Sequence, residues 1–227
     1  MILSLEALAA WAPGLESPDQ WRAWARDPWL PVMGDAPRAN GLPAMLRRRL
    51  EPVGRAALQV AANVLPAITP DALVFVSRRG EPGRTYRLLE QLVRGEAVSP
   101  SGFGLSVHNA VAAQLSIWQG YRRGFTAIAA GPEGVEHGFL ELASRLAGRE
   151  GAVGLLVVFE DAVPEEYGPY LDEPDPRFAW AARFRMGGVG PALRLRSPEP
   201  GPHEVAVGGG GPALRASRAP SPLAGSA

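Results

Sequence analysis

The stretch Ser106-Val107-His108-Asn109 contains the residue types in this sequence that could do chemistry together. A serine hydroxyl beside an imidazole is the pairing of nucleophilic hydrolases and acyltransferases, because the imidazole can accept the hydroxyl proton. The apolar spacing predicts a helix over residues 106–120 with Ser106 at its N-cap, where the hydroxyl would instead accept a backbone N–H. No G-x-S-x-G turn surrounds this serine, so the pattern disfavours a serine hydrolase.

The second feature is the turn over residues 129–134, where a predicted buried strand (125–130) passes directly into a predicted helix (133–148). Such strand-to-helix turns can hold a nucleophile over a helix N-terminus, whose dipole favours negative charge. The residue at this position is Gly131, which has no side chain. The turn therefore suits a nucleophile that the sequence does not supply.

The remaining candidates indicate no cofactor and no metal. His137 and His203 are expected at the surface, and no two histidines have the spacing of a shared helix face. The acids of residues 160–175 are scattered among prolines, which does not match a calcium loop. The glycines at 187–190 and 208–211 do not follow a strand and open a helix, as a dinucleotide fingerprint requires.

Composition narrows the chemistry further. The 227 residues include no cysteine, which excludes disulfides, thiolate ligands and thiolate nucleophiles. Every one of the 23 basic residues is arginine, so lysine Schiff-base chemistry and a P-loop lysine are also excluded.

Charge is balanced overall, with 23 basic and 23 acidic residues, and this does not favour a nucleic-acid partner. Arginine is concentrated in the first half, including the triplet 47–49, for which a solvated helix face and an acidic partner are the two explanations. No apolar stretch is long enough to span a membrane, and the N-terminus does not resemble a signal peptide. We expect a cytoplasmic protein.

Strands and helices that would position these residues follow the apolar pattern. Continuous apolar runs predict buried strands at 73–76, 125–130 and 153–159, and alternating residues predict further strands at 1–9, 177–186 and 192–196. In the strand at 177–186, Arg183 and Arg185 are expected to point outward. Helical spacing predicts helices that begin near residues 18, 43, 53, 82, 106 and 133, with flexible or exposed connections at 99–104 and 160–175.

The order of these elements predicts an α/β sandwich with a largely buried sheet. The domain is expected to cover residues 1–200. Residues 201–227 are rich in Gly, Pro, Ala and Ser and are expected to form a flexible tail.

Several segments resemble the N-terminal half of β-ketoacyl synthases, which have the thiolase-like fold. The resemblance covers roughly residues 1–186 and is most specific in the Ser-Val-His-Asn-Ala stretch followed by the Ala-Ala-Gly turn. Within this family, the sequence is most similar to the short chain length factor type found in aryl polyene biosynthesis clusters. Supporting similarities lie at residues 47–55, 74–81 and 98–100.

The resemblance implies a ketosynthase shape without condensing chemistry. In active ketosynthases this turn carries the acyl-accepting cysteine, which aligns with Gly131, and two histidines come from the C-terminal half. The resemblance also implies that residues 177–186 are the first strand of that second half and that the region with both histidines is missing. His108 matches no catalytic position, and Ser106, His108 and Asn109 belong to the family motif.

A chain length factor pairs with an active ketosynthase and limits the length of its acyl tunnel, in fatty acid, polyketide or polyene biosynthesis. The resemblance implies that the strand at 125–130 pairs across the heterodimer and that the helices at about 100–118 close the tunnel. An acidic acyl carrier protein would suit the arginine-rich first half as a further partner. The predicted interface or tunnel residues are Phe103, Leu105, Trp118, Phe125, Ala127 and Ile128, with core packing as the other explanation for Trp118.

Two alternatives remain open from the sequence. One is a small thioester acyltransferase or hydrolase that uses Ser106 or His108. The other is a ketosynthase-like remnant that forms a homodimer and has no acyl substrate.

Overall fold

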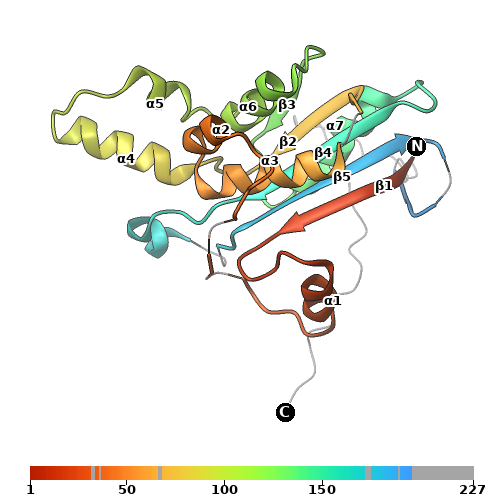
Figure 1. The fold of residues 1–227 in the computed structure, drawn as a ribbon, viewed down its shortest axis with the longest axis horizontal. Helices are drawn as coiled ribbons and strands as arrows, with labels where there is room; N and C mark the ends of the chain where they lie inside the picture. Colours follow the sequence, from red (N-terminus) through yellow and green to blue (C-terminus); the bar gives the residue numbers. More distant parts are fainter. Residues whose placement is uncertain (32–33, 36, 66–67, 172–174, 189, 196–227) are drawn as a thin grey trace, which may run out of the picture.

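The computed structural model describes residues 1–31, 34–35, 37–65, 68–171, 175–188 and 190–195. Within these ranges six strands form one mixed sheet in the order β3-β2-β4-β5-β1-β6 (Figure 1). Strand β2 pairs in parallel with β3 and β4, and the other neighbouring strands pair antiparallel. The strands are β1 (Ile2–Trp11), β2 (Ala72–Val76), β3 (Thr126–Ile128), β4 (Val153–Glu160), β5 (Phe178–Met186) and β6 (Ala192–Arg194).

Helices cover both faces of the sheet, as the α/β prediction requires. Helix α3 lies across β1, β4 and β5 and contacts α6, whereas α7 packs on β2, β3 and β4. Alternate residues of β2 belong to two separate apolar cores, because successive strand residues point to opposite faces. The helices are α1 (Pro18–Arg26), α2 (Ala44–Arg49), α3 (Pro52–Val64), α4 (Pro82–Val93), α5 (Pro100–Gly104), α6 (Ala110–Gln119) and α7 (Gly134–Leu146), with a 3₁₀ helix η1 (Glu165–Tyr170).

Three local predictions are wrong. The stretch 99–104, expected to be a flexible connection, contains α5, whose N-cap Ser99 accepts the backbone N–H of Gly102. The helix expected from residue 106 begins at Ala110, and the Ser106 hydroxyl donates to the Phe103 carbonyl at 2.8 Å. Arg183 does not point freely outward, since its guanidinium donates to the Val64 carbonyl at 2.7 Å beneath the end of α3.

Strand β5 corrects a further expectation from the family resemblance. Instead of beginning a second half, residues 178–186 lie between β4 and β1 in the same sheet and pair with both. The predicted domain boundary at residue 200 and the predicted tail lie outside the described residues.

Two tryptophans of α1 pack against each other beside the end of β1. The rings of Trp21 and Trp24 meet edge to face with centroids 5.5 Å apart. The Trp21 indole donates to the Ala10 carbonyl at 3.3 Å, which ties α1 to the end of β1. A capping box between Ser17 and Gln20 begins the helix.

Candidate functional site

The strand-to-helix turn predicted around Gly131 is present. Strand β3 ends at Ile128, and α7 begins at Gly134, whose N–H donates to the Gly131 carbonyl at 3.1 Å. Gly131 is exposed, so a side chain here would be open to solvent, three residues before the start of α7. This is the arrangement that favours a nucleophile, because the helix dipole stabilises its anionic form.

Packing does not require glycine at position 131. A Cβ atom built there would meet nothing closer than the Glu133 carboxylate, at 3.9 Å. Gly131 is also not among the glycines in the left-handed region of backbone space. The turn therefore has room for a side chain that the sequence omits.

The helix that follows does require its glycines. A Cβ at Gly138 would lie 2.6 Å from Val76 Cγ2 and 3.0 Å from Leu156 Cδ1. Gly134 approaches Val76 in the same way, with a Cβ distance of 3.3 Å. The absence of these two side chains lets α7 lie directly on β2 and β4, which holds its N-terminus beside the end of β3.

His108 has a structural contact. Its Nε2 lies 2.7 Å from the carbonyl oxygen of Ser77, and the ring is half-buried. Ser77 follows β2 and donates its N–H to the Ile128 carbonyl at 3.1 Å. His108 therefore anchors the turn before α6 to the ends of β2 and β3, close to the Gly131 turn.

The serine and histidine of the family motif do not form a catalytic pair. Among the described residues, no hydrogen bond joins Ser106 to His108, and none joins His108 to a carboxylate. Asn109 is the N-cap of α6 but makes no side-chain capping bond. His137 is exposed and contacts the Glu133 carbonyl at 2.7 Å, and His203 lies outside the described residues.

The predicted interface residues come from three parts of the fold: α5, α6 and the region of β3. Phe125, Ala127 and Ile128 are half-buried on or beside β3, which pairs only with β2 among the described strands. Phe103 on α5 is 64% exposed, whereas Leu105 is half-buried. Trp118 and Phe125 pack partly against the core under α3, so core packing accounts for part of their surface.

Sequence reasoning missed a group of covered carboxylates at the carboxyl ends of β2 and β4. One Glu160 oxygen accepts the Arg78 N–H at 2.7 Å, and the other is buried without a partner among the described residues. Glu81 accepts the Glu51 N–H at 2.9 Å and pairs with Arg84 at 3.1 Å. The acid-rich pattern of residues 160–175 predicted an exposed loop. The sequence around these acids contains no signal that shows which of them are buried by a neighbouring loop.

Burial changes the proton affinity of these carboxylates. It raises the pKa of Glu160 to about 7 and that of Glu81 to about 7, and the nearby arginines only partly oppose the effect. Burial also raises the pKa of Asp161 to about 6, against the pull of Arg177, whose guanidinium lies 3.2 Å away. The contacts of these groups fix loops at the end of the sheet rather than the Gly131 turn.

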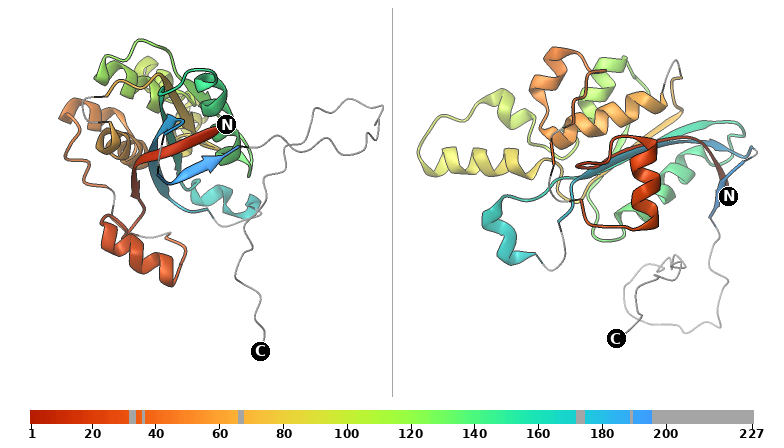
Figure 2. Two further views of the ribbon diagram at one scale, coloured as in Figure 1. Left: turned by 90° about the vertical axis from the view of Figure 1, so that its right-hand side faces the viewer. Right: turned by 60° about the horizontal axis from the view of Figure 1, so that its bottom comes forward.

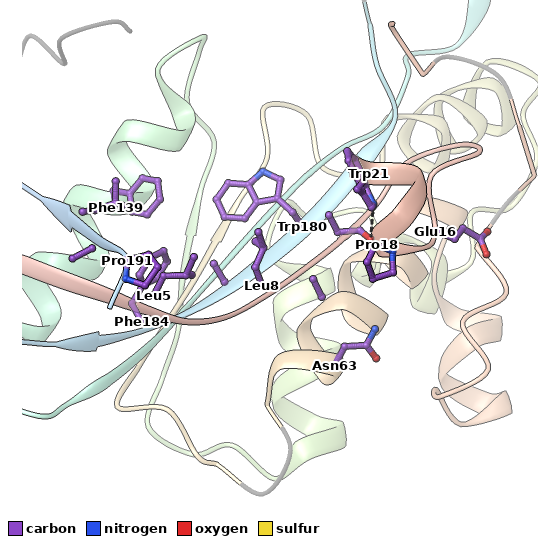
Figure 3. Close-up of a pocket in the computed structure, with 15 residues that line it drawn as sticks. Leu5, Leu8, Glu16, Pro18, Trp21, Asn63, Phe139, Trp180, Phe184 and Pro191 are labelled. Carbon is purple, nitrogen blue, oxygen red and sulfur yellow. Dashed lines mark hydrogen bonds between the residues drawn. The ribbon is translucent and has the colours of Figure 1, made fainter. Parts of the chain in front are cut away.

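An apolar groove of about 930 Å³ lies beside α7, where β5, β1 and β6 continue the sheet. Figure 3 shows Phe139, Trp180 and Phe184 along it and Trp21 and Pro18 from α1 near its other end. Its lining is mostly apolar, and Glu16 is the one charged residue among the described side chains that line it. These residues do not provide the paired acid, base or nucleophile that catalysis would need.

Comparison with protein families identifies the family that has this fold. The family model of the β-ketoacyl synthase N-terminal domain matches residues 21–207. The chain therefore belongs to the β-ketoacyl synthase N-terminal domain family. No curated protein matches the chain.

Solved structures give the same fold. A chain from the complex of the ketosynthase ApeO with its chain length factor ApeC, from Xenorhabdus doucetiae, is 30% identical with a TM-score of 0.73. The match covers 82% of this chain and 80% of that one, so the two are of similar length.

Longer ketosynthase chains are matched only in part. The ishigamide ketosynthase/chain length factor is 15% identical, with a TM-score of 0.63, and a β-ketoacyl synthase from Burkholderia phymatum STM815 is 10% identical, with a TM-score of 0.62. Each match covers 82% of this chain but only 62% and 59% of those chains, respectively. This chain therefore spans about three-fifths of their length and shares their fold over that part.

No described helix is long and apolar enough to cross a membrane.

Proposed function

We propose that this chain is a non-catalytic chain length factor that pairs with an active ketosynthase and shapes its acyl tunnel. The observation that carries the proposal is Gly131: a ketosynthase-family turn that has room for a nucleophile contains none. The chain also has no cysteine elsewhere. A family member built this way can contribute shape and surface to catalysis, but not the acyl-accepting thiolate.

The surface proposed for the partner includes the free edge of β3. Among the described strands it has one neighbour, β2, so its outer backbone groups are available to pair with another strand. Its side chains are half-buried and mostly apolar, which suits an interface that excludes water. The 30%-identical chain comes from a complex of a ketosynthase with its chain length factor, which supports a ketosynthase as the partner.

Phe103 is the main residue that we propose to limit the acyl tunnel of the ketosynthase. It is large, apolar and 64% exposed in this chain, so it could enter a cavity of the partner without leaving a core. A bulky side chain at the end of an apolar tunnel limits the number of carbons that fit. Leu105, at the C-cap of the same short helix, is proposed as a supporting residue.

The acyltransferase or hydrolase alternative gains no support from the contacts of its two residues. The Ser106 hydroxyl already donates to the Phe103 carbonyl, and His108 is held by Ser77 at 2.7 Å. An acyl carrier protein remains a proposed further partner, since the exposed Arg48 and Arg49 on α2 offer charge that an acidic surface would complement.

The test is co-expression with a cysteine-containing ketosynthase, chosen from the genes beside that of this chain where they encode one. The proposal predicts that the two proteins co-purify in a 1:1 ratio, measured by size-exclusion chromatography with light scattering. Ala127→Pro, which removes a backbone donor from β3, should abolish the complex, whereas Ala97→Pro in the exposed connection before α5 should not. If this chain elutes as a monomer or homodimer and does not bind the ketosynthase, the proposal is overturned.

A further inference from the structure

Three arginines converge at the amino ends of the parallel strands. Arg123 precedes β3, Arg145 lies in the last turn of α7, and Arg149 follows that helix. Helix α7 lies on the opposite face of the sheet from α3 (Figure 2), and its C-terminal end reaches the start of β3, where the Arg145 guanidinium donates to Thr126 Oγ1 at 2.9 Å. Together with Asp71, which immediately precedes β2, the three arginines line a pocket of about 530 Å³.

Asp71 holds two of these arginines in place without using most of their donors. Its Oδ1 accepts hydrogen bonds from Arg123 at 2.6 Å and from Arg149 at 2.8 Å, and its Oδ2 accepts the Val153 N–H at 2.9 Å. That backbone bond, with the two guanidiniums, holds the pKa of Asp71 below its ordinary value, so the carboxylate is charged at neutral pH. Each of the three guanidiniums makes its described contacts through one nitrogen, which leaves most of its N–H donors for another acceptor.

Positive charge is in excess in this pocket. Three guanidiniums and one carboxylate line it, so the positive groups exceed the negative ones by two. Glu141 offsets part of this excess without lining the pocket, because it accepts the Thr126 hydroxyl at 2.8 Å and lies 3.5 Å from Arg145.

Tyr121 places an unpaired donor close to the same groups. Its side chain is 8% exposed, and its hydroxyl is buried without a partner among the described residues. Burial raises the pKa of Tyr121, and the charges of all four pocket residues act on its hydroxyl. Buried hydroxyls are normally hydrogen-bonded to the protein, to water or to a bound ion. An anion held by the neighbouring guanidiniums would provide an acceptor.

We propose that this pocket binds a phosphate group, either as free phosphate or as part of a phosphorylated small molecule. The inference does not depend on the proposed function. A phosphate dianion matches the excess of two positive charges, and its oxygens can accept N–H donors from several planar guanidiniums at once. A carboxylate carries one charge and is matched by a single arginine fork. The pocket lies at the opposite end of β3 from Gly131, so the phosphate would be bound apart from the candidate nucleophile position.

The test is titration calorimetry of the full chain with inorganic phosphate, in a phosphate-free buffer at pH 8 and low ionic strength. We expect saturable binding, which Arg123→Gln should weaken by roughly fivefold or more, whereas Arg87→Gln on α4 should leave Kd within about twofold. The two arginines are matched, since their side chains are 54% and 55% exposed and each lies 2.6 Å from a carboxylate. In Arg123→Gln, Asp71 keeps its bonds to Arg149 and Val153, and circular dichroism checks that the fold is retained.

A second variant tests the buried hydroxyl. Tyr121→Phe should weaken phosphate binding by about two- to fivefold and leave the thermal midpoint unchanged or higher, because it removes a polar group that has no partner in the free protein. A merely structural role of the hydroxyl would lower the thermal midpoint instead.

Two further ligands complete the experiment. Glycerol 3-phosphate that binds more tightly than inorganic phosphate would identify a phosphorylated small molecule as the ligand, and equal affinities would assign free phosphate. Acetate should not bind at the concentrations that saturate the chain with phosphate. The site is overturned if phosphate does not bind, if acetate binds as tightly, or if Arg123→Gln and Arg87→Gln weaken binding equally.

Discussion

At the scale of single residues, the chemistry of the chain depends on what is missing from one turn. Gly131 lies where a nucleophile would be expected, in a backbone conformation open to other residues, and the nearest atom to a Cβ at this position would be 3.9 Å away. A glycine forced by packing would say little about function. A glycine where packing allows a side chain fits a subunit that has no need of the nucleophile.

Gly131→Cys tests this interpretation. The free energy of unfolding should change by less than about 0.5 kcal/mol, because an exposed substitution without a clash is close to neutral. The new thiol should react readily with a disulfide reagent, since the N-terminus of α7 favours the thiolate. Loss of the fold would contradict the claim that the position has room. Condensing activity in the isolated variant would contradict the proposal that this chain is non-catalytic.

Glu160 makes stability depend on pH. Burial raises its pKa to about 7 from an ordinary value of 4.5. Between these values the folded state holds a proton that the unfolded chain has released, so the free energy of unfolding falls as pH rises through this window. Glu160→Gln should remove this part of the dependence and stabilise the protein at pH 8 by on the order of 1 kcal/mol.

Urea unfolding at pH 5 and pH 8 measures the effect. Glu165→Gln, on the exposed 3₁₀ helix η1, is the matched control and should change neither value. Equal pH dependence in wild type and Glu160→Gln would show that Glu160 is not desolvated as its contacts indicate.

At the scale of elements, the position of the candidate turn depends on how closely α7 lies on the sheet. Gly138 allows this approach, and a methyl group there would overlap Val76 and Leu156. Gly138→Ala should therefore destabilise the fold by about 1–3 kcal/mol, despite the higher helix propensity of alanine. Gly83→Ala in α4, whose Cβ would meet only the flexible Arg87 side chain at 3.4 Å, should be neutral or slightly stabilising. Equal stability of the two variants by urea unfolding would contradict the packing account.

Local sequence signals predict the elements that bury regular apolar patterns. The strands at 73–76 and 153–159 and the helix at 133–148 agree with β2, β4 and α7 to within two residues, because buried runs, turn glycines and helical spacing are all local. The start of α6 could not be predicted in this way. His108 holds the turn before this helix through the Ser77 carbonyl, a contact between residues 31 positions apart.

The candidate site was predictable at the same level. The Gly131 turn follows from a strand, a glycine and a helix in succession, and the structure contains it. The covered carboxylates were not predictable. Glu160 is covered by the residues that follow β2, and its contact with the Arg78 N–H joins residues 82 positions apart in the sequence. An acidic stretch in isolation resembles a solvated loop.

At the scale of the whole molecule, the described chain is a single α/β sheet layer with helices on both faces, and it matches about three-fifths of the longer ketosynthase chains. Its exposed apolar surface lies in separate places: the β3 edge with α5, the exposed Leu89, Leu92 and Val93 of α4, and the groove along β5, β1 and β6. Large uncovered apolar surfaces are typical of proteins that function with a partner. This distribution is consistent with the proposed role as a subunit.

The most direct measurement is condensation of an acyl carrier protein substrate with malonyl carrier protein, followed by mass spectrometry of the products. It would be made with this chain, with the ketosynthase and with their complex. The account predicts no product from this chain alone and products of defined length only from the complex. Turnover by this chain alone, or identical products from the ketosynthase with and without it, would contradict the account.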